Sequence, residues 1–373
     1  MTTSILLMAG LLLAFANGAN DNFKGVATLF GSGTADYRRT LAWATATTLF
    51  GSLMAVVLAQ ELLARFGGKG LVPDELVGDP AFLASVALAA GVTVLLATRI
   101  GMPISTTHAL VGALVGAGLG SASVVRWASL GRVFLAPLLF SPLVALVGSA
   151  LLFPALRRLS VRMGASEETC FCVGVEPTVV DLSTTLEATA MVPSLTGTVG
   201  PAVECRERFD GRALGVQVAP LLDALHYLSA GLVSFARGLN DAPQIAALLL
   251  AVPRSSSLGS IVLCGAAIAL GGLRGAQRVA ETMSHRITTM TAGQGFAANL
   301  VTGALVVAAS RWGLPVSTTH VSCGSLFGLG LAGGRTRWGL IGKVLLAWFI
   351  TLPTAAALAW VSFVLLHRLR LPS

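Results

Sequence analysis

The sequence predicts an all-α polytopic membrane protein, and three observations support this fold class. Its 373 residues are 54% hydrophobic and only 11% charged, with a mean hydropathy of +0.80, whereas a soluble domain carries roughly 25% charged residues. The apolar stretches lack the alternation of polar and apolar residues that strands of a membrane barrel show. The 42 glycines suit membrane helices, because small residues let helix backbones approach closely.

The apolar stretches mark the predicted spans. A helix needs about 20 mostly apolar residues to cross the hydrocarbon core, and several stretches are shorter than this. We therefore predict about 10–12 transmembrane segments, some of them broken or re-entrant helices. The candidate stretches are 4–17, 41–63, 81–98, 103–120, 133–156, 219–236, 242–252, 258–273, 296–310, 315–332 and 344–366.

The net charge of +8 does not indicate a partner nucleic acid. Basic residues lie in short loops, as at Arg38–Arg39 and Arg157–Arg158, which is typical of membrane topology signals. Such residues flank both ends of the last apolar stretch, so the orientation of the chain in the membrane stays open.

The chain contains an internal repeat. Residues 97–119 and 309–331 are identical at thirteen of 23 aligned positions and share the frame G-x-P-x-S-T-T-H followed by spaced glycines. A second pair lies upstream of these blocks, FANGAND from Phe15 and FARGLND from Phe235. We predict a tandem duplication, with a first transmembrane repeat at 1–156, a polar central loop at 157–218 and a second transmembrane repeat at 219–373.

The central loop contains three of the five cysteines, Cys170, Cys172 and Cys205. No cluster of histidines accompanies them, so we expect thiols or a disulfide rather than a metal site. The role of this segment stays open.

The duplication favours a secondary transporter. Such proteins place the substrate site between two repeats, near the membrane midplane, on discontinuous helices. Short apolar segments interrupted by Gly or Pro in corresponding places are the sequence signal for that site, and this chain has two such pairs.

The S-T-T-H blocks are the predicted anion site. Pro103 and Pro315 interrupt apolar stretches and favour the first turn of a new helix. The free N–H groups and positive end of such a helix attract anions, and neighbouring hydroxyls add donors. The predicted substrate-binding residues of the two blocks are Ser105, Thr106, Thr107, Ser317, Thr318 and Thr319.

The Asn-Asp pairs are the predicted cation site. Asn20–Asp21 and Asn240–Asp241 follow Gly-containing breaks in apolar segments. An ionised Asp inside a membrane is costly and usually functional. Its oxygens, with amide and backbone oxygens, suit sodium or a proton. Both asparagines are also candidates for contact with the anion.

Lys24 breaks the symmetry of the repeat, because Gln244 occupies its place in the second half. We expect Lys24 to contact the anion or to replace part of a coupling cation beside Asp21. Further candidate site residues are the matched histidines His108 and His320 as proton relays, together with Gln244, Gln294 and Asn299.

At these residues the sequence resembles the PiT-type inorganic phosphate transporter family. The hallmark motifs are Gly18-Ala19-Asn20-Asp21, Gly238-Leu239-Asn240-Asp241 and the two S-T-T-H blocks, which cover both halves. Leu239 stands where the family motif has Ala, and Lys24 stands where many members have a small polar residue. The resemblance implies an inverted-topology repeat and symport of phosphate with sodium or protons.

Three alternatives stay open at this point. A sulfate permease of the same fold would need no acceptor for a phosphate hydroxyl, which Asp21 and Asp241 offer. An anion channel is disfavoured by the buried carboxylates, and an enzyme by the lack of a catalytic constellation. We expect an integral protein of the bacterial inner membrane in contact with the lipid bilayer, without a cofactor or a metal beyond transported sodium; a homodimer is allowed.

Overall fold

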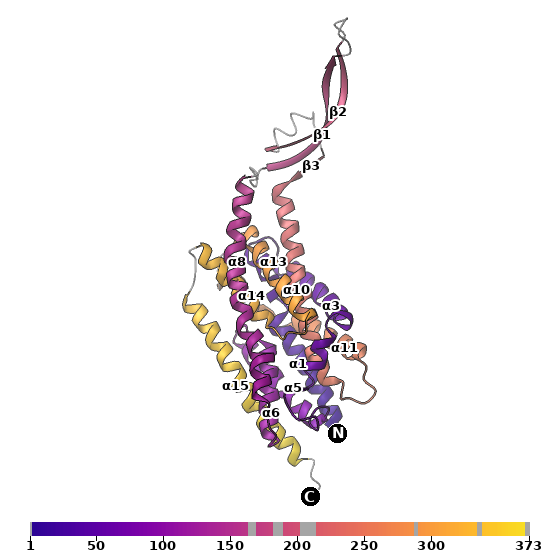
Figure 1. Cartoon of the computed structure of the whole chain (residues 1–373), viewed down its shortest axis with the longest axis vertical. Helices are drawn as coiled ribbons and strands as arrows, with labels where there is room; N and C mark the ends of the chain where they lie inside the picture. Colours follow the sequence, from indigo (N-terminus) through magenta and orange to yellow (C-terminus); the bar gives the residue numbers. More distant parts are fainter. Residues whose placement is uncertain are drawn as a thin grey trace. The chain divides into compact units, whose positions relative to one another are not determined.

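A computed structural model of the chain describes residues 2–162, 169–181, 189–201, 214–286, 290–333 and 338–369. The chain divides into two compact units. Residues 1–153 and 226–373 form a helical unit, and residues 154–225 form a second unit that contains the strands (Figure 1).

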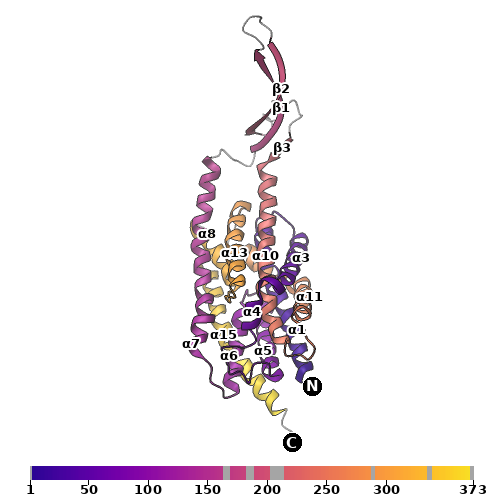
Figure 2. The same cartoon turned by 45° about the vertical axis from the view of Figure 1, so that its right-hand side comes forward.

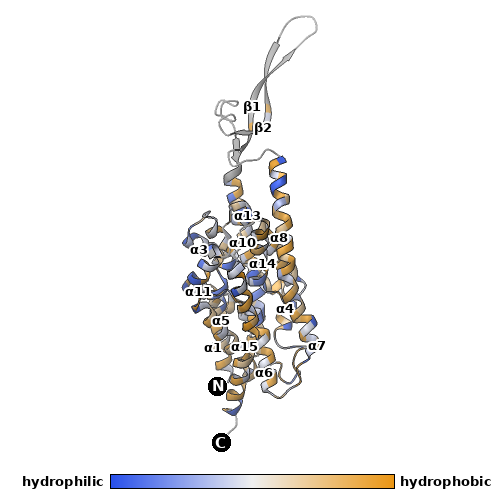
Figure 3. Ribbon diagram, turned by 90° about the vertical axis from the view of Figure 1, so that its left-hand side faces the viewer, coloured by the Kyte–Doolittle hydropathy of each residue, from blue (hydrophilic) through white to orange (hydrophobic). Residues whose placement is uncertain are grey.

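Helices of two kinds build the helical unit. Among the described residues, seven helices are long and apolar enough to cross a membrane, and Figure 3 shows hydrophobic residues along most of them. Shorter helices complete each half. The first half contains α1 (Thr2–Asp21), α2 (Ala27–Gly31), α3 (Tyr37–Leu58), α4 (Gln60–Arg65), α5 (Pro80–Arg99), α6 (Thr106–Gly120), α7 (Trp127–Ser129) and α8 (Ala136–Arg162). The second half contains α10 (Val218–Leu249), α11 (Ser257–Gly275), α12 (Gln277–Glu281), α13 (Ala292–Arg311), α14 (Thr318–Gly333) and α15 (Trp338–Arg368).

Short non-α turns join some of these helices: the 3-10 turn η1 (Lys24–Val26) and the π-helical turns η2 (Leu130–Leu135) and η3 (Thr282–Arg286). Polar caps begin several others. Asp36 accepts from the backbone N–H of Arg39 at 2.9 Å at the start of α3, and Asp79 accepts from Ala81 N at 3.1 Å before α5. Such caps satisfy N–H groups that have no partner inside the helix.

The two halves have inverted topology, as predicted. α8 and α15 run in opposite directions, and so do α1 and α10 (Figures 1 and 2). α1 begins and α15 ends at the same end of the helical unit (Figure 2).

The halves are interlocked by glycines. A Cβ on Gly112 or Gly116 of α6 would meet Leu352 O or Ala356 O of α15 at 2.3 or 1.9 Å. In the second half, α14 approaches α8 in the same way through Gly324 and Gly328. Lipid tails are as apolar as Leu, so close packing of small residues, not exclusion from water, holds membrane helices together.

We expected breaks in the helices at Gly18 and Gly238, just before the Asn-Asp pairs, and the structure corrects this. α1 continues through Gly18 to Asp21, and α10 continues without a break to Leu249. A Cβ on Gly18 would meet Ile268 O of α11 at 1.9 Å, and one on Gly238 would meet Thr48 O of α3 at 2.1 Å. The glycines therefore serve close helix contact rather than a break.

The central segment also differs from the polar loop that we expected. Strands β1 (Thr169–Asp181), β2 (Thr189–Pro201) and β3 (Leu214–Gln217) form an antiparallel sheet in the order β2-β1-β3. We predicted a loop because the segment contains many charged residues. However, β1 is also rich in Val and Thr, and β-branched residues favour strands. Cys170 and Cys172 lie on β1, and Cys205 lies outside the described residues.

Candidate functional site

Two helix N-termini meet inside the helical unit, and the G-x-P-x-S sequence explains their geometry. Gly101 lies two residues after the end of α5 and has φ +69°, while Met102 N donates to Ala97 O at 3.0 Å. A positive φ is easy only for Gly. Pro103 lies between the two helices, and Ser105, whose backbone is extended, caps α6 by accepting from His108 N at 3.1 Å.

The second half repeats this turn. Gly313 has φ +67°, and Leu314 N donates to Ala309 O at 2.8 Å. Ser317 accepts from His320 N at 3.1 Å. We expected Pro103 and Pro315 in the first helical turn, but they precede it, because each serine takes the cap position.

The two turns hold each other by crossed hydrogen bonds. Thr107 of α6 donates to Val316 O at 3.2 Å, and Thr319 of α14 donates to Ile104 O at 2.8 Å. The positions correspond in the repeat, so the contact is close to two-fold symmetric. It brings the predicted hydroxyls of both halves together, with Thr318 also buried in the first turn of α14.

Both predicted carboxylates reach this contact. Asp21 is 1% and Asp241 3% exposed. The amide of Asn17 donates to Asp21 Oδ2 at 2.9 Å and to Asp241 Oδ2 at 3.1 Å, so one side chain bridges the two carboxylates. Thr106 donates to Asp21 Oδ2 at 3.0 Å, which joins the end of α1 to the start of α6.

Asn20 and Asn240 hold the turns in place. Asn20 donates to Thr98 Oγ1 at 2.9 Å and to Met102 O at 3.1 Å. Asn240 donates to Val316 O at 3.2 Å and to Asp241 Oδ1 at 2.8 Å. The two amides thus link the helices that carry the carboxylates to the helix starts.

The Lys24 ammonium lies in a cage of oxygen atoms. It contacts Asp21 Oδ1 and donates to Asn20 Oδ1, Ile104 O and Thr319 Oγ1, each at 2.7 Å. An ammonium has three N–H groups, so protein oxygens occupy all of them here. The arrangement resembles the oxygen shell of a bound cation.

Sequence reasoning missed the second buried cation, Arg237. Its Nη2 donates to Asn22 Oδ1 at 3.0 Å and to Thr48 Oγ1 at 3.1 Å, and its Nη1 lies 3.9 Å from Asp241 Oδ2. The signal was present in the repeat, because Asn17 of FANGAND corresponds to Arg237 of FARGLND. Two carboxylates and two cations thus balance one another in the core.

Three other candidates reach the site or its border. Gln244 accepts from Thr107 Oγ1 at 3.0 Å. The rings of His108 and His320 lie 4.3 Å apart across the two halves, and His320 stacks on Trp348 at 3.6 Å.

The last two candidates separate. Asn299 donates to Thr28 Oγ1 at 2.8 Å and lines a cavity beside Lys24. Gln294 is not brought to the site: its side chain accepts from Thr291 N at 2.9 Å and completes the cap of α13. We therefore assign Gln294 a structural role.

The sequence signature of the phosphate transporter family matches residues 17–359. The chain belongs to this family. The predicted resemblance is confirmed, and with it an integral membrane transporter rather than an enzyme.

Individual relatives agree with the family match. A protein named as a phosphate permease from Pyrococcus horikoshii is 27% identical over 96% of both chains. A protein named as a low-affinity inorganic phosphate transporter from Rhizobium meliloti is 30% identical over 95% of this chain and 93% of its own. A solved structure, "The sodium-dependent phosphate transporter", superposes on this chain with a TM-score of 0.75 at 24% identity. The match covers 99% of this chain and 100% of the solved one, so the two proteins have the same fold.

Proposed function

We propose that this transporter moves inorganic phosphate across the bilayer in symport with a cation. One observation supports this most directly: the hydroxyl-rich starts of α6 and α14 meet two buried carboxylates at the contact between the repeats. The names of the relatives from Pyrococcus horikoshii and Rhizobium meliloti point to the same substrate.

The anion would bind at the two helix starts. Backbone N–H groups of the first turn lack partners inside the helix, and the positive helix end attracts an oxyanion. Ser105, Thr106 and Thr107, with their counterparts Ser317, Thr318 and Thr319, would add hydroxyl donors once their present protein partners are released. Phosphate near neutral pH also carries a hydroxyl group, which would donate a hydrogen bond to the carboxylate of Asp21 or Asp241. Sulfate has no such hydroxyl, so these carboxylates favour phosphate.

The coupling cation would bind at Asp241. Asp21 already contacts the Lys24 ammonium, whereas the guanidinium of Arg237 stays 3.9 Å from Asp241 and hydrogen bonds elsewhere. Asn17 Oδ1 is buried without a partner, which adds a nearby free acceptor. A proton or sodium would satisfy these oxygens, and the solved relative, which is named as sodium-dependent, supports sodium.

Uptake of labelled phosphate by proteoliposomes tests this proposal. We expect accumulation above equilibrium when a sodium gradient is imposed; accumulation with a proton gradient alone would change the coupling ion and leave the substrate. Asp241→Asn should abolish accumulation, whereas Asp36→Asn, whose side chain is 57% exposed, should not.

Excess unlabelled sulfate distinguishes the two anions. Weak inhibition by sulfate supports a phosphate transporter. Gradient-driven sulfate uptake without phosphate uptake would overturn the substrate, and the absence of uptake of both would overturn the proposed function. We expect the protein to act in the bacterial inner membrane.

A further inference from the structure

A small polar cavity lies beside Lys24, between α2, α13 and α14. Its volume is about 10 Å³, which is room for about one water molecule. The polar residues that line it are Lys24, Thr28, Asn299, Thr302 and Ser322. All five are at most 7% exposed. Polar groups are costly to bury in a membrane protein, so this cluster needs a reason beyond packing.

A chain of hydrogen bonds leads outward from this cavity. Thr28 and Asn299 are joined at 2.8 Å, and the Asn299 amide also donates to Ser229 Oγ at 3.3 Å. Ser229 donates to His226 O at 2.9 Å, and the His226 ring lies 3.4 Å from Thr34 Oγ1. Thr34 is half-buried in the loop after α2. The polar residues thus extend from Lys24 to the edge of the helical unit.

The buried ring of His226 adds a further polar group to this path. Its Nε2 is buried without a hydrogen-bond partner. The ring lies close to α13 at Gly295, where an added Cβ would be 2.4 Å from that nitrogen. An unpartnered ring nitrogen beside a hydroxyl-lined cavity is suited to contact with a solvated ion or a water molecule.

Six polar residues of this path have apolar counterparts in the other half of the repeat. An offset of 220 residues aligns α1 and α2 with α10, and an offset of 212 residues aligns α5 with α13 and α6 with α14. They match Thr28 with Leu248, Asn299 with Ala87, Thr302 with Ala90, Ser322 with Leu110, Ser229 with Ala9 and His226 with Leu6.

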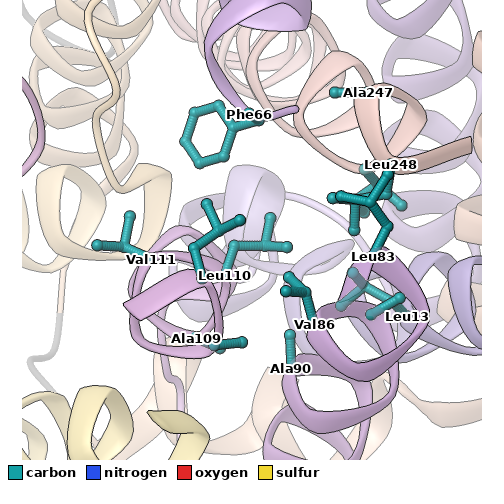
Figure 4. Packing of buried hydrophobic residues seen from close by; sticks show 14 of the residues in the cluster. Leu13, Phe66, Leu83, Val86, Ala90, Ala109, Leu110, Val111, Ala247 and Leu248 are labelled. Carbon is teal, nitrogen blue, oxygen red and sulfur yellow. The ribbon is translucent and has the colours of Figure 1, made fainter. Parts of the chain in front are cut away.

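These six counterparts are apolar and belong to one buried cluster, which also includes Leu13, Phe66 and Leu83. Figure 4 shows Leu110, Leu248 and Ala90 packed in it. We call this cluster the apolar plug. Leu6 and Ala9 lie in the first half of α1, so this part of the plug lies toward the end of the helical unit where α1 begins and α15 ends (Figure 2).

We propose that the anion travels between the site and one membrane surface along the path of Thr28, Asn299, Thr302 and Ser322, past Lys24, and that the apolar plug closes the opposite side. The inference rests on the proposed anion transport and adds its route. Entering a hydroxyl-lined passage costs a hydrated anion less free energy than entering an apolar passage, because hydroxyl groups replace part of its hydration shell. The positive charge of Lys24 lies at the inner end of this path. The corresponding residue of the other half, Gln244, is neutral.

Cysteine accessibility in matched pairs tests the route. In a background without the five native cysteines that retains uptake, Thr302→Cys is compared with Ala90→Cys, and Ser322→Cys with Leu110→Cys. A small charged thiol reagent should modify the first member of each pair about tenfold faster, because only a solvated thiol forms a reactive thiolate. Phosphate, or sulfate as a second probe, should slow that reaction.

Equal rates within both pairs, or faster reaction at Ala90 and Leu110, would overturn the route. So would reaction rates that neither anion changes. These readouts do not need net transport. If wild-type vesicles take up phosphate but the pairs react equally, the route alone is wrong; if uptake of phosphate fails while sulfate protects Ser322→Cys, only the substrate is wrong.

Uptake by a nearly isosteric variant provides an independent test. Thr302→Val removes a hydroxyl that donates to Ser325 Oγ at 2.8 Å. Phosphate uptake should fall about tenfold, because the path loses one hydroxyl that would donate a hydrogen bond to the passing anion. The control Thr93→Val removes a buried hydroxyl on α5 that bonds only to Ala89 O of its own helix, and its uptake should stay near wild type. Equal effects of both variants would contradict the route.

Discussion

The buried charges are arranged differently in the two halves. The first half places its cation after the carboxylate, as Lys24 after Asp21, and the second half places it before, as Arg237 before Asp241. The corresponding positions hold the neutral residues Gln244 and Asn17. A buried carboxylate without its cation is strongly destabilising. Each Asp therefore depends on a partner that the repeat does not duplicate.

Lys24→Gln tests whether the ammonium replaces a coupling cation. The variant should leave Asp21 buried without a cation, at a cost of about 3–5 kcal/mol, unless a free ion fills the oxygen cage. We expect a melting temperature that falls in choline chloride and recovers in sodium chloride, because an ion that binds only the folded state stabilises it. Uptake should also require more cations per anion.

The control for this variant is Lys69→Gln, since Lys69 is exposed. It should leave both the melting temperature and the stoichiometry near wild type. An unchanged number of cations per anion in Lys24→Gln would show that Lys24 does not replace a coupling ion.

Arg237→Gln should destabilise the fold through Asp241, Asn22 and Thr48, which lose their shared partner. A broken buried pair costs about 3–5 kcal/mol. By contrast, Arg39→Gln breaks an exposed pair with Asp36 and should cost at most about 1 kcal/mol. Thermal unfolding in detergent compares the two variants, and similar losses would mean that Arg237 is not a buried counter-charge.

At the scale of elements, α6 and α14 are held by the helices of the opposite half. Gly116 of α6 lies against Ala356 O of α15, and Gly328 of α14 lies against Leu146 O of α8. Each short helix therefore has its anion-facing start at the site and its glycines against the other repeat. The position of the site therefore depends on the packing of α6 against α15 and of α14 against α8.

Gly116→Ala tests the close contact. Its Cβ would meet Ala356 O at 1.9 Å, so α6 and α15 would have to separate. We expect a loss of about 1–3 kcal/mol, typical of overpacking, and reduced yield of monodisperse protein in detergent. Gly131→Ala is the matched control, because nothing lies within 4 Å of its added Cβ; equal losses for both would contradict a packing role for Gly116.

At the scale of the whole molecule, the site lies at a seam between the halves. His108 and His320 face one another there, with ring centroids 4.3 Å apart. In transporters built from two repeats, access alternates when one part moves against the other around a fixed site. A seam that opens at the helix starts would allow the anion to leave.

Bridging this seam should stop transport. In the cysteine-free background, His108→Cys combined with His320→Cys is joined by a short thiol-to-thiol crosslinker that a reducing agent cleaves. We expect uptake to be lost when the two cysteines are bridged and to be restored when the crosslinker is cleaved. Both measurements use one preparation, so uptake after cleavage is the reference for uptake of the bridged form. Full uptake by the bridged form would show that the two helix starts need not separate.

Local sequence determined much of this protein. Apolar stretches long enough to cross a bilayer predict the helices, and repeated motifs predict both halves of the site, because a duplicated segment folds in the same way twice. Gly101 and Gly313 before their prolines, with Ser105 and Ser317 as caps, already specify each turn through backbone rules that act over a few residues.

Only the tertiary structure decided which helices interlock and which charges pair. Arg237 meets Asn22 and Thr48, and Thr319 meets Ile104, although these partners are more than 180 residues apart in the chain. Local sequence did not predict the central strands, because a polar composition does not exclude strand pairing. It also did not predict the unbroken α10, because the role of Gly238 depends on its close contact with Thr48 of α3. Such contacts arise from packing between distant segments, for which a single sequence carries no local signal.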